Sequence, residues 1–281
     1  MDTSFASSSP TPLLAVDRQP GYWFVRLNRP EKRNALSDEL VAGLAEVCEH
    51  VAADLEARAL VLSGAGGHFC AGADFGRFLE LMSTTPGQAD DPIAVYNRQF
   101  GAMLERIAAL PVATVAVVTG SAMGGGCGLA AACDRVIAAD DAKFAMPEVT
   151  LGVAPAQIAP FVVRRAGARR ARWLMLGGAR LAAAEAQAAG LADVVVPVTE
   201  LRGALGTDLL RLGLAEPTAL RATKRIVGRT LEDPLPVALD AAAREFAGLL
   251  RHGAAREGIV ASRERRAPSW QPPPPRLPEF P

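Results

Sequence analysis

Residues 112–128, VATVAVVTGSAMGGGCG, decide the fold of this chain of 281 residues. They begin with Val112–Thr119, an uncharged run of Val, Thr and Ala that is typical of a strand covered on both faces. The run continues into a glycine-rich loop, Gly120–Gly128, and an Ala-rich helix that we expect to end near Asp134. A strand that leads through glycines into a helix leaves unpaired amides at the helix N-terminus, and these bind negative charge. The stretch therefore predicts an α/β fold with an anion-binding loop.

A second glycine-rich loop, GHFCAGADF at Gly67–Phe75, follows another buried run, Ala59–Leu62. Three interpretations compete for such loops: close helix–strand packing alone, a phosphate-binding loop, or an oxyanion hole. The phosphate loop is disfavoured because the Gly-Lys-Ser/Thr ending is missing and no well-spaced acidic residue marks a ribose contact. An oxyanion hole needs two amides from different segments that converge on one oxygen, and two such loops offer them.

The rest of the chain separates into a β/α part and a helical part. A turn signal between Leu13–Asp17 and Tyr22–Leu27 predicts a hairpin, and Ser37 caps a helix of regular apolar spacing. From Gln157 onward the pattern is helical, and only a strand at Asp193–Val196 interrupts it. Further predicted segments are strands at Arg135–Ala139 and Lys143–Ala145, a helix at Ile93–Leu110 and a disordered patch at Ser83–Pro92. We expect a flexible N-terminus at 1–11, a core at 12–200, a helical region at 201–270 and a proline-rich, polyproline-like tail at 271–281 that stays outside the core.

Composition narrows the classes of function. Thirty basic residues balance thirty acidic ones, so no global field attracts nucleic acid or a membrane surface. The four cysteines lack metal-ligand spacing, no apolar run is long enough to span a membrane, and the start does not resemble a signal peptide. We therefore expect a cytoplasmic protein with no metal, no nucleic-acid partner and no membrane partner.

Four segments, in this order and spacing, resemble the enoyl-CoA hydratase/isomerase (crotonase) family: LNRPEKRNALS (27–37), FCAGAD (69–74), MGGGCGLA (123–130) and FAMPEVTLG (144–152). The resemblance covers about residues 12–270. It implies a crotonase-like ββα spiral core with a helical C-terminal region, which in the family joins subunits into trimers or hexamers. It also implies an acyl-CoA thioester as substrate, so coenzyme A enters with the substrate and no separate cofactor is expected.

The resemblance places the oxyanion hole at the backbone amides of Ala73 and Gly125. Losing one donor of such a hole typically costs about 3–4 kcal/mol of transition-state stabilisation. It also maps the family's second glutamate onto Glu148, as acid and base. The mostly apolar residues around Glu148 would raise the pKa of its carboxyl group, which suits proton transfer. The alternative is a helix-capping or surface carboxylate.

Two departures from the family pattern bear on the reaction. The family's first glutamate falls at Gly128, so a second carboxylate is absent. The segment 153–165, VAPAQIAPFVVRR, resembles instead the branch that hydrates branched glutaconyl-type CoA esters. There the backbone N–H of Ala156 and the side-chain amide of Gln157 are candidates to hold the water. Hydration of an enoyl-CoA by a single glutamate is thus the predicted function. The alternatives are a Δ3–Δ2 enoyl-CoA isomerase and a non-catalytic acyl-CoA-binding homologue.

Further residues are assigned to substrate binding by the same resemblance. Lys32 and Arg33 stand where the family contacts coenzyme A, although a solvated charged loop is the alternative for either residue alone. The carbonyl of Ala71 resembles an adenine contact. Gly72 and Gly124, which precede Ala73 and Gly125 in the chain, are assigned to substrate binding as well.

Overall fold

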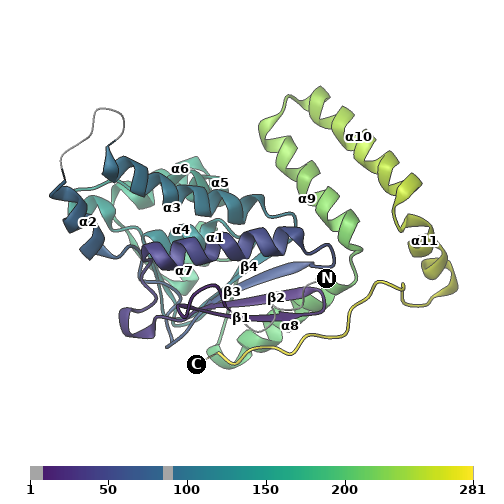
Figure 1. The fold of residues 1–281 in the computed structure, drawn as a ribbon, viewed down its shortest axis with the longest axis horizontal. Coiled ribbons are helices and arrows are strands. Elements are labelled where there is room, and N and C mark those ends of the chain that lie inside the picture. The colour runs from purple at the N-terminus through teal and green to yellow at the C-terminus, as the bar shows by residue number, and fades with distance from the viewer. Residues whose placement is uncertain (1–8, 85–90, 281) are drawn as a thin grey trace.

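The computed structural model describes residues 9–84 and 91–280 as a sheet-centred core with a projecting helical arm (Figure 1). The predicted patch at Ser83–Pro92 lies mostly outside these residues, as do the first eight residues of the N-terminus expected to be flexible. Within the described part, Thr11 is buried against Gly43 of helix α1 (Asp38–Ala53).

The strands form two sheets. They are β1 (Leu14–Gln19), β2 (Tyr22–Leu27), β3 (Ala59–Gly64), β4 (Ala113–Val118), β5 (Ser121–Met123), β6 (Arg135–Ala139), β7 (Lys143–Ala145), β8 (Arg180–Ala182) and β9 (Val194–Val196). The larger sheet has the order β1-β2-β3-β4-β6-β9, with β1 antiparallel to β2 and the other pairs parallel. The smaller sheet has the order β5-β7-β8, in which β7 and β8 are antiparallel.

The helices follow the predicted alternation. They are α1 (Asp38–Ala53), α2 (Phe75–Met82), α3 (Pro92–Ala109), α4 (Gly125–Ala131), α5 (Ala159–Ala166), α6 (Ala168–Leu176), α7 (Ala183–Ala189), α8 (Leu201–Gly213), α9 (Pro217–Glu232), α10 (Leu235–His252) and α11 (Ala255–Glu264), with short 3-10 turns η2 (Pro30–Lys32), η3 (Glu148–Leu151) and η4 (Val198–Glu200). Ser37 caps α1 by accepting a hydrogen bond from the amide of Leu40 at 3.3 Å, as predicted.

Both faces of the large sheet are covered, because side chains along each strand alternate between two cores. In β2, Trp23 and Val25 face the cluster that includes α1 and α3. Tyr22 and Phe24 face a second cluster, which includes the apolar stripe of α8. The prediction that Val112–Thr119 contains a strand buried on both faces is confirmed, since β4 is buried along almost its whole length.

Two short strands were missed by the sequence analysis. β5 lies inside the loop predicted at Gly120–Gly128, and β8 interrupts a region predicted to be helical apart from Asp193–Val196. Each is only three residues long, which is too short to establish a period of two. β5 forms because Gly120 turns the chain with a φ of +52°, and a Cβ there would lie 2.1 Å from the carbonyl oxygen of Gly67.

The C-terminal region leaves the core and then returns to it. Helices α9, α10 and α11 project away from the sheet, whereas α8 packs on it (Figure 1). The extended segment after α11 runs back along the core, where Gln19 exchanges two hydrogen bonds with the backbone of Arg276, at 2.9 and 2.7 Å. Leu277 and Phe280 pack against the second cluster. The tail expected to stay outside the core therefore contacts it.

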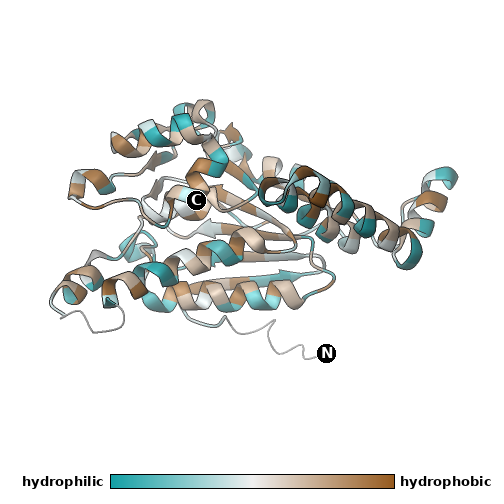
Figure 2. Cartoon of the chain, turned by 90° about the horizontal axis from the view of Figure 1, so that it is seen from above, coloured by the Kyte–Doolittle hydropathy of each residue, from teal (hydrophilic) through white to brown (hydrophobic). Residues whose placement is uncertain are grey.

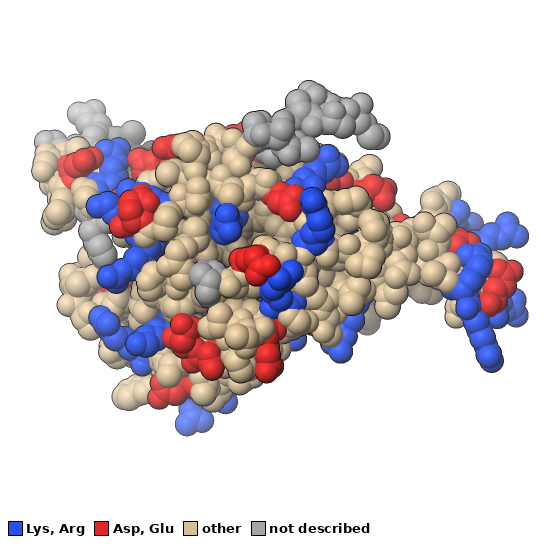
Figure 3. Space-filling view, turned by 90° about the horizontal axis from the view of Figure 1, so that it is seen from below, with Lys and Arg blue, Asp and Glu red and all other residues tan. Residues whose placement is uncertain are grey.

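Positive and negative side chains are interspersed on the face shown in Figure 3, as the balanced composition predicts. Within the described part of the chain, no helix is both long and apolar enough to cross a membrane.

Candidate active site

The loop after β3 lies alongside β5, which brings the two glycine-rich segments together. The amides of Phe69 and Cys70 donate to the carbonyl oxygens of Thr119 and Ser121, each at 2.9 Å. The amide of Met123 donates back to Cys70 at 3.0 Å. These hydrogen bonds form a short parallel ladder, so the loop is held as firmly as a strand.

On its other side the same loop is bonded to the segment before α1. The amide of Leu36 donates to Gly72 at 2.8 Å, and the amide of Asp74 donates to Leu36 at 3.2 Å. The amide of Ala71 donates to Arg33 at 2.9 Å. The amide of Ala73 is different, because it donates to no other residue that the structure describes.

The second free amide belongs to Gly125, the first residue of α4. Helix N-termini leave their first amides without intrahelical partners, and Gly125 donates to no acceptor in the described ranges. Gly72, with a φ of +93°, allows the close approach of the two segments. A Cβ there would lie 2.6 Å from the carbonyl oxygen of Met123 and 3.4 Å from the nitrogen of Gly125. Ala73 and Gly125 thus have backbone amides that donate to no described acceptor, and they lie on adjoining segments.

Glu148 faces the start of α4. It is the first residue of η3, and its Oε1 would lie 2.9 Å from a Cβ at Gly124, a position that also has a φ of +49°. Its Oε2 is buried and has no hydrogen-bond partner among the described residues. Burial raises the pKa of the Glu148 carboxyl group above its ordinary value, only partly opposed by a hydrogen bond from its own backbone. A carboxylate with an unused buried oxygen is poised to bind or move a proton.

Two apolar side chains form a wall beside Gly125. A Cβ at Gly125 would lie 3.0 Å from Cδ1 of Leu36 and 3.2 Å from Cζ of Phe100 on α3. Phe100 was missed by the sequence analysis because residues 75–105 carry the weakest pattern in the chain. An apolar wall beside the amides lowers the local dielectric, which strengthens hydrogen bonds to a developing negative charge.

The cysteines near the site are unsuited to nucleophilic chemistry. Cys70 and Cys127 are fully buried, and burial raises the pKa of each thiol to about 12. The charge of Glu148 adds to the shift at Cys127. Both thiols therefore stay protonated near neutral pH. No cluster of three or more metal-ligating side chains occurs within the described residues.

The two residues that were predicted to hold the water, Ala156 and Gln157, have different surroundings in the structure. The amide of Ala156 donates to the carbonyl of Ala154 at 2.8 Å, so its assignment as a free donor is wrong. The amide of Ala156 is used in a tight local turn, and no residue type in the sequence marks such a turn. The side chain of Gln157, by contrast, lies against Gly101 of α3 and forms no hydrogen bond with another described residue.

Lys32 and Arg33 lie on an exposed loop that is bonded to the segment of Ala71 and Ala73. Arg33 adopts a left-handed conformation and accepts the hydrogen bond from Ala71 through its backbone. Neither side chain forms an ion pair within the described part of the chain. Both cations remain available to an anionic ligand at this edge of the site.

Asn34 and Arg29 position the loop that carries Ala73, and neither residue was predicted from the sequence to have a role. Asn34 is fully buried, and its Nδ2 donates to the carbonyls of His68 and Ala65 at 2.7 and 2.9 Å. Arg29 pairs with Asp74 at 2.9 Å, which is the main reason that the pKa of Asp74 is lowered. Asp74 in turn caps α2, so it orients the loop and is held ionised.

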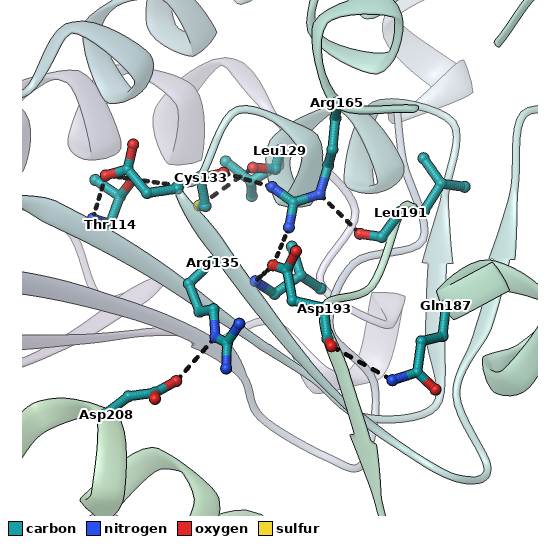
Figure 4. Close-up of polar contacts among 11 residues, drawn as sticks. Thr114, Leu129, Cys133, Arg135, Arg165, Gln187, Leu191, Asp193 and Asp208 are labelled. Carbon is teal, nitrogen blue, oxygen red and sulfur yellow. Dashed lines mark hydrogen bonds and ion pairs between the residues drawn. The ribbon is translucent and has the colours of Figure 1, made fainter. Parts of the chain in front are cut away.

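A polar network fixes the far end of α4 (Figure 4). Arg165 donates to the carbonyls of Cys133 and Leu191, at 2.7 and 2.8 Å, and forms an ion pair with Asp193. Asp193 also accepts from the amide of Val136 in β6 at 2.7 Å. Because α4 is anchored to the sheet at this end, the position of its N-terminus beside Glu148 is fixed as well.

Comparisons with known proteins identify the family of this chain. The family model described as "Enoyl-CoA hydratase/isomerase" matches residues 17–273, and the chain belongs to this family. It is 32% identical over 260 residues to the 2,3-dehydroadipyl-CoA hydratase of Escherichia coli, a match that covers 92% of this chain and 98% of that protein.

Two solved structures are similar over nearly the whole chain. An enoyl-CoA hydratase/isomerase from Marinobacter aquaeolei has a TM-score of 0.89, and Pseudomonas aeruginosa AtuE has a TM-score of 0.88. Each is 40% identical, and each match covers 92% of this chain and 99% of the other. The expected crotonase-like α/β fold with a helical C-terminal region is confirmed.

Proposed function

We propose that this protein hydrates the double bond of an enoyl-CoA thioester, with Ala73 and Gly125 as the oxyanion hole and Glu148 as acid and base. The observation that supports this most directly is that Oε2 of Glu148 is buried and has no hydrogen-bond partner among the described residues. Glu148 faces the start of α4, where the amide of Gly125 also donates to no described acceptor. Family membership supports the acyl-CoA substrate.

The reaction proceeds through one carboxylate. The carboxylate of Glu148 accepts a proton from water while the water oxygen bonds to the β-carbon of the substrate. The electron pair of the double bond moves onto the thioester oxygen, where the amides of Ala73 and Gly125 stabilise the enolate. Glu148 then delivers its proton to the α-carbon, which restores the thioester carbonyl. One water is added, and the carboxylate is regenerated.

The raised pKa of Glu148 suits this double role. A general base that is also a general acid works best when its pKa lies near the working pH. Burial, which is the cause of the shift, moves Glu148 in that direction.

Coenzyme A is held at the exposed edge of the site. Lys32 and Arg33 supply unpaired cations for its phosphates, and the carbonyl of Ala71 is positioned by the same loop. A branched glutaconyl-type acyl group is the proposed substrate, on the strength of the segment 153–165.

The proposed assembly is a trimer or a hexamer built through the helical arm. Apolar side chains of the arm are exposed on the single chain. They include Val227, Leu231, Leu235, Leu239, Phe246 and Leu250. Figure 2 shows brown, hydrophobic residues among teal, hydrophilic ones along the projecting helices. Exposed apolar patches of this kind mark protein contacts. A monomer in light scattering would exclude the proposal.

Glu148→Gln tests the function, with a glutaconyl-type enoyl-CoA as substrate. The variant keeps the shape of the side chain and removes its ionisation, so hydration should fall by at least about 100-fold. Turnover equal to that of the wild type would refute the assignment.

The alternatives give different results with the wild-type protein in heavy water. The absence of a second acid at Gly128 favours the isomerase as the second candidate. Double-bond migration without net hydration would identify an isomerase. No exchange at the α-carbon of any acyl-CoA would identify a binding protein.

A further inference from the structure

The place for a second carboxylate is filled in this protein. Gly128 is buried in α4, and a Cβ there would lie 2.2 Å from Cγ2 and 2.7 Å from Cβ of Ile158. Ile158 itself is almost fully buried. A glutamate at position 128 would have to displace Ile158 from the core. The water that attacks the β-carbon therefore needs a different second partner.

The neighbour of Ile158 in the chain, Gln157, places its side-chain amide against Gly101. Its Oε1 would lie 1.8 Å from a Cβ at Gly101, and its Cδ would lie 2.8 Å away. Gly101 stands in the middle of α3, where glycine destabilises a helix by about 1 kcal/mol relative to alanine. The absence of a side chain at Gly101 makes room for the amide of Gln157.

The contact of Gln157 with Gly101 is one residue along α3 from the wall beside the proposed hole. Gly101 directly follows Phe100, whose Cζ would lie 3.2 Å from a Cβ at Gly125. The guanidinium of Arg98, which pairs with Glu105 at 2.7 Å, lies 3.3 Å from the same Cβ position at Gly101. The positive charge of Arg98 favours the orientation of the Gln157 amide in which its carbonyl oxygen lies on the side of Arg98. In this orientation the NH₂ group of Gln157 is free to donate elsewhere. The side chain of Gln157 forms no hydrogen bond with another described residue.

We infer that Gln157 is a positioning residue, which holds the attacking water in place of the missing second carboxylate. Its neutral amide donates to the water oxygen, while Glu148 accepts the water proton. Gly101 and Ile158 act through it, by fixing its side chain and by excluding an acid from position 128. This inference rests on the proposed hydration.

Two reactions of the same site distinguish a water-positioning role of Gln157 from a merely structural role. Hydration needs a positioned water. Exchange of an α-proton of a saturated acyl-CoA in heavy water needs only Glu148 and the two hole amides. Gln157→Leu, which keeps the size of the side chain, should lower kcat for hydration on the order of 100-fold. The exchange rate should stay within about twofold of the wild type, since no hole contact changes.

Gly101→Ala reaches the same amide from the opposite side. Its methyl group would collide with Oε1 of Gln157, so hydration should fall while exchange persists. The double variant Gly101→Ala/Gln157→Leu should be no slower in hydration than Gln157→Leu alone, because both changes act on one group. Gly203→Ala in α8 is the matched control, since a Cβ there meets nothing within 4 Å.

The outcomes distinguish this inference from the proposed function. Hydration by Gln157→Leu at the wild-type rate would overturn it, and so would an equal loss of hydration and exchange. A wild-type protein that exchanges α-protons without hydrating any enoyl-CoA would refute the proposed function itself.

Discussion

Gly128→Ala tests whether the room for a second acid has been lost. The new Cβ would lie 2.2 Å from Cγ2 of Ile158 and 2.7 Å from its Cβ, both closer than side chains approach one another. Because both residues are buried, the neighbours have little space to move. We expect overpacking to lower the free energy of unfolding by about 1–3 kcal/mol. Gly128→Glu should be worse, because it adds an unpaired buried carboxylate.

A double-mutant cycle isolates the contact. Ile158→Ala removes Cγ2 and should cost about 2–5 kcal/mol alone, by leaving a cavity. In Gly128→Ala/Ile158→Ala the new methyl group occupies part of that cavity, and only the 2.7 Å contact remains. The double variant should therefore be more stable than the sum of the single effects predicts, by about 1–2 kcal/mol.

Urea denaturation followed by circular dichroism measures these differences. All variants are compared at one protein concentration, because assembly makes stability depend on it. Gly203→Ala, in an exposed turn of α8, should be neutral or stabilising, by up to about 1 kcal/mol. Additive single effects, or a Gly128→Ala variant as stable as the wild type, would refute the reasoning.

Three further predictions concern the site. Glu148→Gln should raise the melting temperature near neutral pH. The raised pKa of Glu148 means that the native state favours the protonated carboxyl group. The wild-type protein therefore has the full stability at low pH and loses part of it as the pH rises through the native pKa, whereas the neutral glutamine does not ionise. The gain should vanish near pH 4 in calorimetry, and a constant gain would contradict the cause. Gly124→Ala, which would bring a Cβ to 2.9 Å from Glu148 at a φ of +49°, should reduce kcat at least tenfold in the hydration assay; unchanged kcat would show that the backbone tolerates it. Asn34→Ala removes hydrogen bonds to two partly buried carbonyls and should lower the free energy of unfolding measured in urea by about 2–4 kcal/mol. A loss below about 1 kcal/mol would mean that water replaces these hydrogen bonds.

The sequence predicted those parts of the fold that local patterns determine. β4 was predicted because its uncharged β-branched run extends over more than one period, and α1 because Ser37 marks its start. Both glycine-rich loops were recognised, since glycine is needed where the backbone must approach another segment closely. β5 was missed because three residues next to glycines carry no periodic signal.

The contacts that complete the site join residues far apart in the sequence. Nothing near Gly101 reveals that its missing side chain makes room for Gln157. Likewise, the burial of Asn34 beneath the loop at His68 depends on the folded arrangement of two segments. The prediction for Ala156 was wrong for the opposite reason, because a turn to Ala154 is local but has no distinctive residue type.

The buried thiols make the opening of this fold measurable. Cys48, Cys70, Cys127 and Cys133 are all buried, with each thiol pKa raised to about 12, so alkylating reagents can modify them only when the structure opens. Cys70 and Cys127 lie beside the proposed hole, whereas Cys48 lies on α1. The chain thus carries native reporters of local and global fluctuation, and the order in which they react reports which part of the core opens first.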